Sequence, residues 1–151
     1  MTRFDHKPAD RIPWQEIPGG QELVDYFGHD PEFGDAEVVQ LVLNRRAPSL
    51  ISIHTWSNDS FDQAKHVVVT LSVSDIADVE LEHFSHQNVL NDLVIRPAPE
   101  RAERHPYYGR KPHPEDIEIQ LGPCYGLNGF IRASAVSISF VRGLPHDMKR
   151  L

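Results

Sequence analysis

The residues of this chain whose types could support chemistry are its nine histidines, its single cysteine and several pairs of acidic residues. His83 and His86 form an HxxH pair, and the surrounding DVELEHFSHQ is typical of the end of a strand. Residues three apart on a strand face opposite ways, so this pair does not predict a shared ligand set. No HExxH or CxxC pattern accompanies it. The sequence therefore predicts surface or capping histidines, no metal site and no cofactor.

Cys124 lies in GPCYGLNG, a glycine-flanked turn that superficially resembles a nucleophile site. Thiolate chemistry needs a neighbouring base and an electropositive pocket, and the sequence places no histidine beside this residue. Acidic residues two apart, Asp35 with Glu37 and Glu80 with Glu82, share a strand face. A glycosidase pair needs carboxyl groups ~5–10 Å apart, but alternating acids are far commoner on a solvated strand face. We expect no catalytic residues.

The segment 97–114, PAPERAERHPYYGRKPHP, is the strongest candidate for a functional surface. Its five prolines cannot donate to a β-ladder, and connections longer than ~12–15 residues are usually functional or disordered. Tyrosine and arginine are enriched at interface hot spots, and basic residues among aromatics can also stack on single-stranded nucleic acid. The alternative is a mobile, solvated loop. The candidate partner-binding residues are Arg101, Arg104, Tyr107, Tyr108 and Arg110.

If that loop is only a surface, replacing Tyr107, Tyr108 and Arg110 together by alanine should change the stability by no more than ~1 kcal/mol. The overall charge of −7 argues against nucleic acid and anionic membranes as partners and suits a basic protein. One cysteine excludes an internal disulfide, and no apolar run approaches the ~18 residues of a membrane span. These features predict a cytoplasmic protein.

The elements that must position these residues form one domain over 1–151, with an irregular arm at 1–13 and the proline-rich loop at 97–114. Apolar residues at i, i+3 and i+4 predict one short helix near 20–27. Two-residue alternation predicts about seven strands, at 36–45, 49–56, 66–73, 75–84, 88–95, 115–121 and 130–141. Without βαβ alternation, we expect an α+β, β-rich fold with a curved or closed, meander-like antiparallel sheet. The predicted core is Leu23, Phe27, Val39, Leu41, Val69, Leu71, Ile119 and Ile138.

The N-terminal part of the sequence also resembles a known family. A tryptophan, an IPGG turn, a short helix ending in Phe-Gly and a PEFGDAEV segment leading into the first strand are similar to the immunity protein 50 family of polymorphic-toxin immunity proteins and their uncharacterised relatives. The resemblance covers residues 14 to about 141, although Gly34 stands where relatives often carry histidine or asparagine. It implies an α+β fold and neutralisation of a toxin by binding. The matching residues are Trp14, Gly19, Gly20, Phe27, Gly28, Pro31, Phe33, Asp35 and Glu37.

Three functions follow as hypotheses. The first is a non-catalytic protein that binds a partner, which the resemblance suggests is a toxin and the charge suggests is basic. The second is a small-ligand protein or enzyme with a pocket on the curved sheet, lined by His54, Trp56, Cys124 and Tyr125. The third is a homo-oligomer held by exposed strand edges.

Overall fold

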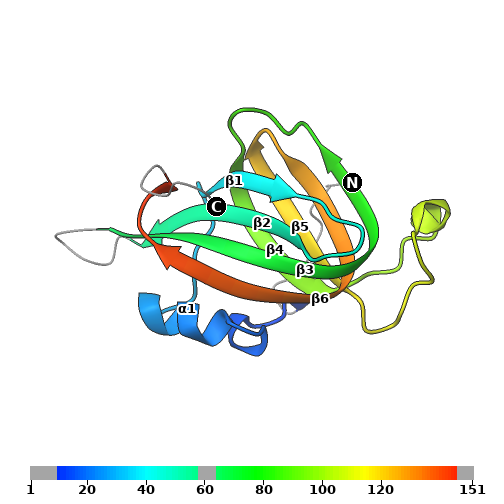
Figure 1. The fold of residues 1–151 in the computed structure, drawn as a ribbon, viewed down its shortest axis with the longest axis horizontal. Helices are drawn as coiled ribbons and strands as arrows, with labels where there is room; N and C mark the ends of the chain where they lie inside the picture. The colour runs from blue at the N-terminus through cyan, green and yellow to red at the C-terminus, as the bar shows by residue number, and fades with distance from the viewer. Residues whose placement is uncertain (1–9, 58–63, 146–151) are drawn as a thin grey trace.

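Six antiparallel strands close into a barrel in the computed structural model, which describes residues 10–57 and 64–145 (Figure 1). The order around the barrel is β1-β2-β3-β6-β5-β4, so two three-stranded meanders meet along β3·β6 and β1·β4. No helix of the described ranges has the length and apolar character needed to cross a membrane. The elements are η2 (Trp14–Glu16), α1 (Gly20–Phe27), β1 (Glu37–Val42), β2 (Ser49–Ser57), β3 (Lys65–Glu82), β4 (Val89–Pro97), η3 (Ala102–Tyr107), β5 (Ile117–Tyr125) and β6 (Asn128–Arg142).

The β-rich fold and the helix at 20–27 are confirmed, but the strand count differs from the prediction. The segment 66–73 and most of the segment 75–84 form the single long strand β3, which ends at Glu82. Asp75 has a left-handed φ of 58°, and the register with β6 shifts between Ile76 and Asp78. A bulge of this kind bends a strand without ending it. The polar residues at 74 and 75, which resemble a turn in the sequence, therefore lie inside the continuous hydrogen-bonded ladder between β3 and β6.

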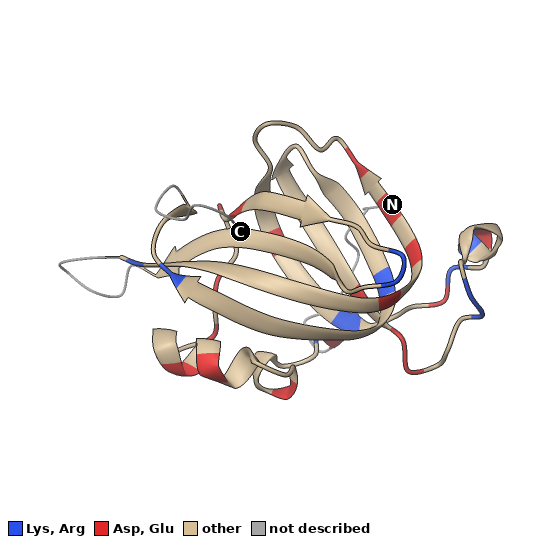
Figure 2. Cartoon of the chain, in the orientation of Figure 1, with Lys and Arg blue, Asp and Glu red and all other residues tan. Residues whose placement is uncertain are grey.

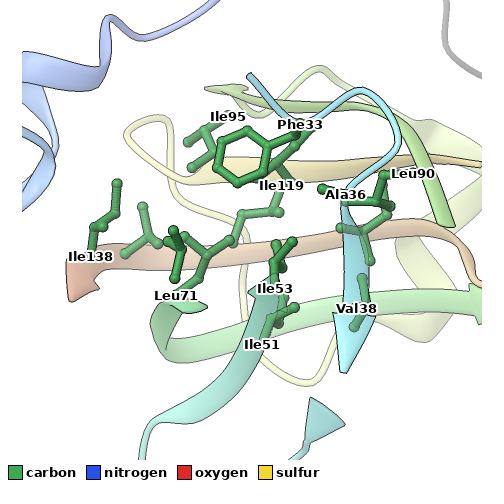
Figure 3. Packing of buried hydrophobic residues seen from close by; sticks show 14 of the residues in the cluster. Phe33, Ala36, Val38, Ile51, Ile53, Leu71, Leu90, Ile95, Ile119 and Ile138 are labelled. Atoms are coloured by element: carbon green, nitrogen blue, oxygen red, sulfur yellow. The ribbon is translucent and has the colours of Figure 1, made fainter. Parts of the chain in front are cut away.

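The barrel interior is a single apolar cluster to which every strand contributes (Figure 3). Six of the eight predicted core residues are buried, and Leu23, Leu71 and Ile119 have no exposed surface. The prediction for Val39 is wrong, because this residue is half-buried and its neighbour Val38 is 2% exposed. Leu41 is partly buried and packs against the core opposite Ile51. The register between β1 and β2 shifts between Val38 and Gln40, which places Val38 in the core.

The IPGG turn holds α1 against the C-terminal half of β6. Gly19 has a left-handed φ of 87°, and a Cβ there would overlap the carbonyl oxygen of Ile138. The same Ile138 donates its N–H to Pro18 O at 2.7 Å. A Cβ at Gly20 would overlap the carbonyl oxygen of Trp14. Both glycines are therefore required for close backbone approach.

The PEFGDAEV segment continues this packing into the barrel. The ring of Phe33, which is 3% exposed, lies 5.3 Å from the ring of Trp14. Asp35 has a φ of 68° and turns the chain into β1. Gly28 ends α1 with a φ of 82°, donating its N–H to Val24 O. The glycines, the aromatic residues and Asp35 of the motif thus have structural roles in this fold.

Candidate functional site

The proline-rich loop covers part of the edge of β3, at the end of the strand where β2 no longer pairs with it. β2 pairs with β3 only over Lys65–Val73, while β3 continues to Glu82. Past that point the loop joins the strand edge, with Gly109 N–H donating to Ala77 O at 2.7 Å. An uncovered strand edge presents unpaired backbone groups, so the loop protects part of β3.

Arg104 fixes η3 to the same part of β3. Its guanidinium donates to both oxygens of Asp78, at 3.1 and 2.8 Å, and to Val79 O at 3.3 Å. The side chain of Asp78 is 2% exposed. Hydrogen bonding to Asp78 raises the pKa of Arg104, with burial opposing it. A bidentate arginine–carboxylate pair is both stronger and more directional than a single ion pair.

Arg110 makes a second bidentate pair at the other end of the loop. Its Nη1 and Nη2 donate to the two oxygens of Asp116 at 3.2 and 2.8 Å, and Nη2 also donates to Asp75 O at 3.0 Å. Burial raises the pKa of Asp116, but hydrogen bonds from Arg110, the His113 backbone and Arg132 outweigh it and lower that pKa to about 2. Asp116 therefore stays ionised down to strongly acidic pH.

Arg132 of β6 joins the two ends of the loop. This side chain is 4% exposed and donates from Nε to Asp116 at 2.9 Å. Its other nitrogens donate to Pro99 O at 3.3 Å, to His113 O at 3.2 Å and to the hydroxyl of Tyr108 at 3.3 Å. One guanidinium thus bonds the chain before and after η3, which restrains the whole excursion.

A third group of paired arginine and carboxylate side chains lies where the chain leaves β4 and enters the loop. Arg96 donates from Nε to Glu118 at 3.0 Å, and Arg101 bonds the same carboxylate. The side chain of Glu118 is 1% exposed, and Arg101 lies 4.2 Å above the ring of Phe130. Burial, together with the charge of Arg96, lowers the pKa of Arg101. Two arginines therefore share one buried carboxylate.

The structure divides the five candidate residues into anchors and one presented ring. Arg101, Arg104 and Arg110 bond buried carboxylates, and Tyr108 contacts Arg132. Tyr107 is 64% exposed, with the Arg104 guanidinium 4.3 Å from its ring centroid. The triple alanine variant of Tyr107, Tyr108 and Arg110 is now expected to lose well over ~1 kcal/mol, because it removes a partner of buried Asp116.

A segment that is basic in sequence is acidic on its outer side. With its arginines turned inward, the exposed charges of the loop include Glu100, whose side chain is 76% exposed, and Glu103, against Lys111; the exposed Glu115 follows directly after the loop. Acidic positions also recur along the C-terminal half of β3 next to the loop (Figure 2). The surface that surrounds Tyr107 would therefore attract a basic partner.

Sequence reasoning missed the buried side of these pairs. The missed residues are Arg96, Asp78, Asp116, Glu118 and Arg132. A signal existed, because ionised residues interrupt apolar strands in EDIEIQL and FIRAS. Alternating charges on a strand favour a solvated face, and a charged residue is fully buried only when it is paired. Their partners lie in the loop, which periodicity does not place.

The predicted pocket on the sheet does not form as one site. His54 and Trp56 lie on β2, where His54 Nε2 is 3.0 Å from Nδ1 of His66. Cys124 and Tyr125, both exposed, end β5, which β1 and β4 separate from β2. None of the four lines the described cavities of about 370, 470 and 550 Å³.

His83 and His86 are both exposed, and no three of the described His, Cys, Asp and Glu residues are placed to hold a metal ion. Comparison of the chain with protein-family models, with curated proteins and with solved structures finds no match. The resemblance to the immunity protein 50 family stays a prediction.

Proposed function

We propose that this chain is a non-catalytic binding protein that recognises a basic protein through the surface around Tyr107, and that it neutralises a toxin by this contact in the cytoplasm. The observation that carries the proposal is the orientation of the loop. Its arginines bond buried carboxylates, while Tyr107 and Glu103 face solvent.

The anchoring supports binding because it removes an entropic cost. Ordering a flexible loop at an interface costs conformational entropy and so reduces the binding free energy. A loop that is already ordered loses little further entropy when it binds. Arg104 attaches η3 to β3, and Arg132 bonds the chain before and after η3, with no partner present. An exposed tyrosine on a rigid support supplies a large contact area with only two side-chain torsions.

The acidic rim supports a basic partner. Opposite charges on two proteins raise their association rate and disfavour partners of the wrong charge. Here the exposed Glu100 and Glu103 belong to the same loop as Tyr107. Glu80, whose side chain is 44% exposed, lies 3.7 Å from the Arg104 guanidinium that faces the Tyr107 ring. Net charge agrees in sign, at −7 for the whole chain.

The test looks first for a toxin-like reading frame adjacent to this gene and then uses its product; a neighbourhood without such a frame would count against toxin neutralisation. We expect co-expression of the chain to protect cells from that product, and Tyr107→Ala to weaken the purified complex at least roughly tenfold. Tyr125→Ala is the matched control, because Tyr125 is similarly exposed (58%) at the far end of β5 from the loop. If neither variant lost protection, or if both weakened the complex equally, the contact would lie elsewhere. An unprotected host would refute toxin neutralisation.

A further inference from the structure

The loop covers only part of the edge that β3 exposes, and the remainder has the features of a strand-binding site. Beyond Val73, no strand of the described residues pairs with β3 on the side opposite β6. Gly109 bonds Ala77 O, and the Arg104 side chain reaches Val79 O. Because backbone groups alternate in direction along a strand, those of Leu81 point to the same open side.

Apolar side chains border this edge on one face. A cavity of about 470 Å³ lies between the β1–β2 turn and β3, and Leu43, Ile76 and Val79 contribute its apolar lining. Leu43 is 51% exposed, and Phe84, just past the end of β3, is 56% exposed. Both are among the five large exposed apolar residues of the described chain, and a third, Tyr107, lies over Arg104 on the other face of the strand.

The opposite face of the same strand is acidic. The register pairs Asp78 with Arg132, Glu80 with Phe130 and Glu82 with Asn128, which places the three acids on one face. Val79 and Leu81 alternate with them and pack against the core. Arg104 pairs with Asp78 at 2.8 Å and more loosely with Glu80 at 3.7 Å, and His83 lies 3.6 Å from Glu82. The side chains of Glu80 and Glu82 are still 44% and 40% exposed, so both carboxylates can be reached from solvent.

We propose that the edge of β3 at residues 79–82 binds an extended segment of the partner as an added strand, with basic side chains on the Glu80 face and apolar side chains toward Leu43. This inference rests on the proposed function, because it states how the same surface holds its basic partner. Strand addition takes affinity from backbone hydrogen bonds and specificity from alternate side chains. Because one face of β3 is acidic and the other apolar, a bound strand should alternate basic and apolar side chains.

A second copy of this chain fits the edge less well. Pairing two β3 edges would bring Glu80 and Glu82 of one copy against the same acidic strand of the other. Like charges directly opposite each other destabilise a pair of strands. A foreign basic strand meets no such repulsion.

The probe for this site is a short synthetic peptide of alternating lysine and valine, titrated into the full chain by NMR. We expect a dissociation constant on the order of 100 µM, with shifts and slowed exchange at the amides of Val79 and Leu81. A peptide with alternate backbone amides methylated keeps its charge but lacks the strand donors, so its binding should fall at least about tenfold. A peptide of alternating glutamate and valine should not bind.

The matched protein variants remove equal charge at two places. Glu80→Gln with Glu82→Gln should weaken the lysine peptide several-fold, whereas Glu22→Gln with Glu32→Gln, at exposed positions outside β3, should not. Equal binding of the methylated peptide, or no binding of the lysine peptide at about 1 mM, would overturn strand addition. Neither result touches the proposed function, which rests on the toxin and Tyr107. Protection of Leu81 in a dimer without peptide would instead assign the edge to self-association.

Discussion

The barrel interior and the layer beneath the proline-rich loop are both buried, but opposite chemistry holds them. Inside the barrel, Leu71, Ile53 and Ile119 pack without a polar partner among them. Beneath the loop, carboxylates such as Glu118 and Asp116 are 1% exposed and each meets two arginines. Apolar packing tolerates partial loss, whereas a buried charge that loses its partner keeps its full desolvation cost.

The sharpest test of this difference is Glu118, whose carboxylate Arg96 and Arg101 share. Glu118→Leu removes the buried carboxylate that two arginines share and should lower the free energy of unfolding by about 3–5 kcal/mol. The triple variant Arg96→Met, Glu118→Leu, Arg101→Met removes all three charges and should recover most of that loss, as measured by urea denaturation. A triple variant less stable than Glu118→Leu would mean that the ion cluster itself stabilises the fold.

The interior responds to a truncation in a graded way. Leu71 has no exposed surface and pairs with Ile51 and Ile138 on neighbouring strands. Leu71→Ala should cost about 2–5 kcal/mol in thermal or urea unfolding, and Leu71→Met less than ~1.5 kcal/mol because volume is nearly kept. If the alanine variant lost less than ~1 kcal/mol, Leu71 would not be a core residue.

The contributions of the two regions to stability should also differ in their dependence on pH. The pKa of Asp116 is lowered to about 2 in the folded protein, from an ordinary value of 3.8. Its contribution to stability is therefore full above pH ~4 and declines as the pH falls through ~2, by roughly 2 kcal/mol. Comparison with Asp116→Asn isolates this dependence, since the variant lacks the titrating group. Parallel stability curves for the two proteins between pH 4 and 2 would refute the assignment.

The smallest effect is expected at the presented ring. Tyr107 is 64% exposed and its main contact is with Arg104, so Tyr107→Ala should lower the unfolding free energy by less than ~1 kcal/mol. The same measurement on Arg104→Gln should show a loss several times larger, because Asp78 is then buried without its cation. Similar losses in the two variants would erase the distinction between anchor and presented residue.

Periodicity predicted what depends on local pattern. The helix at 20–27 and the buried alternation of Val69 and Leu71 follow from spacing alone. Periodicity failed at two backbone irregularities. The bulge after Val38 changes which residues of β1 are buried, and the left-handed Asp75 lies in a polar stretch of β3 that resembles a turn. Neither is visible in residue types, because a bulge is set by the pairing partner.

The candidate surface was located by sequence but misread. Its prolines and tyrosines identify the loop, and its arginines fit a partner-binding surface as long as no carboxylate partner is visible nearby in the chain. Arg104 and Asp78 are 26 positions apart, and Arg110 reaches Asp75 across 35. Only the closed barrel brings these residues together, so the inward direction of the arginines required the structure.

Amide hydrogen exchange at Gly109 tests the anchored loop most directly. Its N–H bonds Ala77 O at 2.7 Å in the middle of the excursion, between the Arg104 and Arg110 anchors. If ion pairs hold the loop on β3, this amide should exchange orders of magnitude more slowly than an open loop and should lose that protection in Arg104→Gln. Exchange at the rate of an unprotected peptide in the native chain would contradict the account, because the loop would then be a solvated connection with no rigid surface to present.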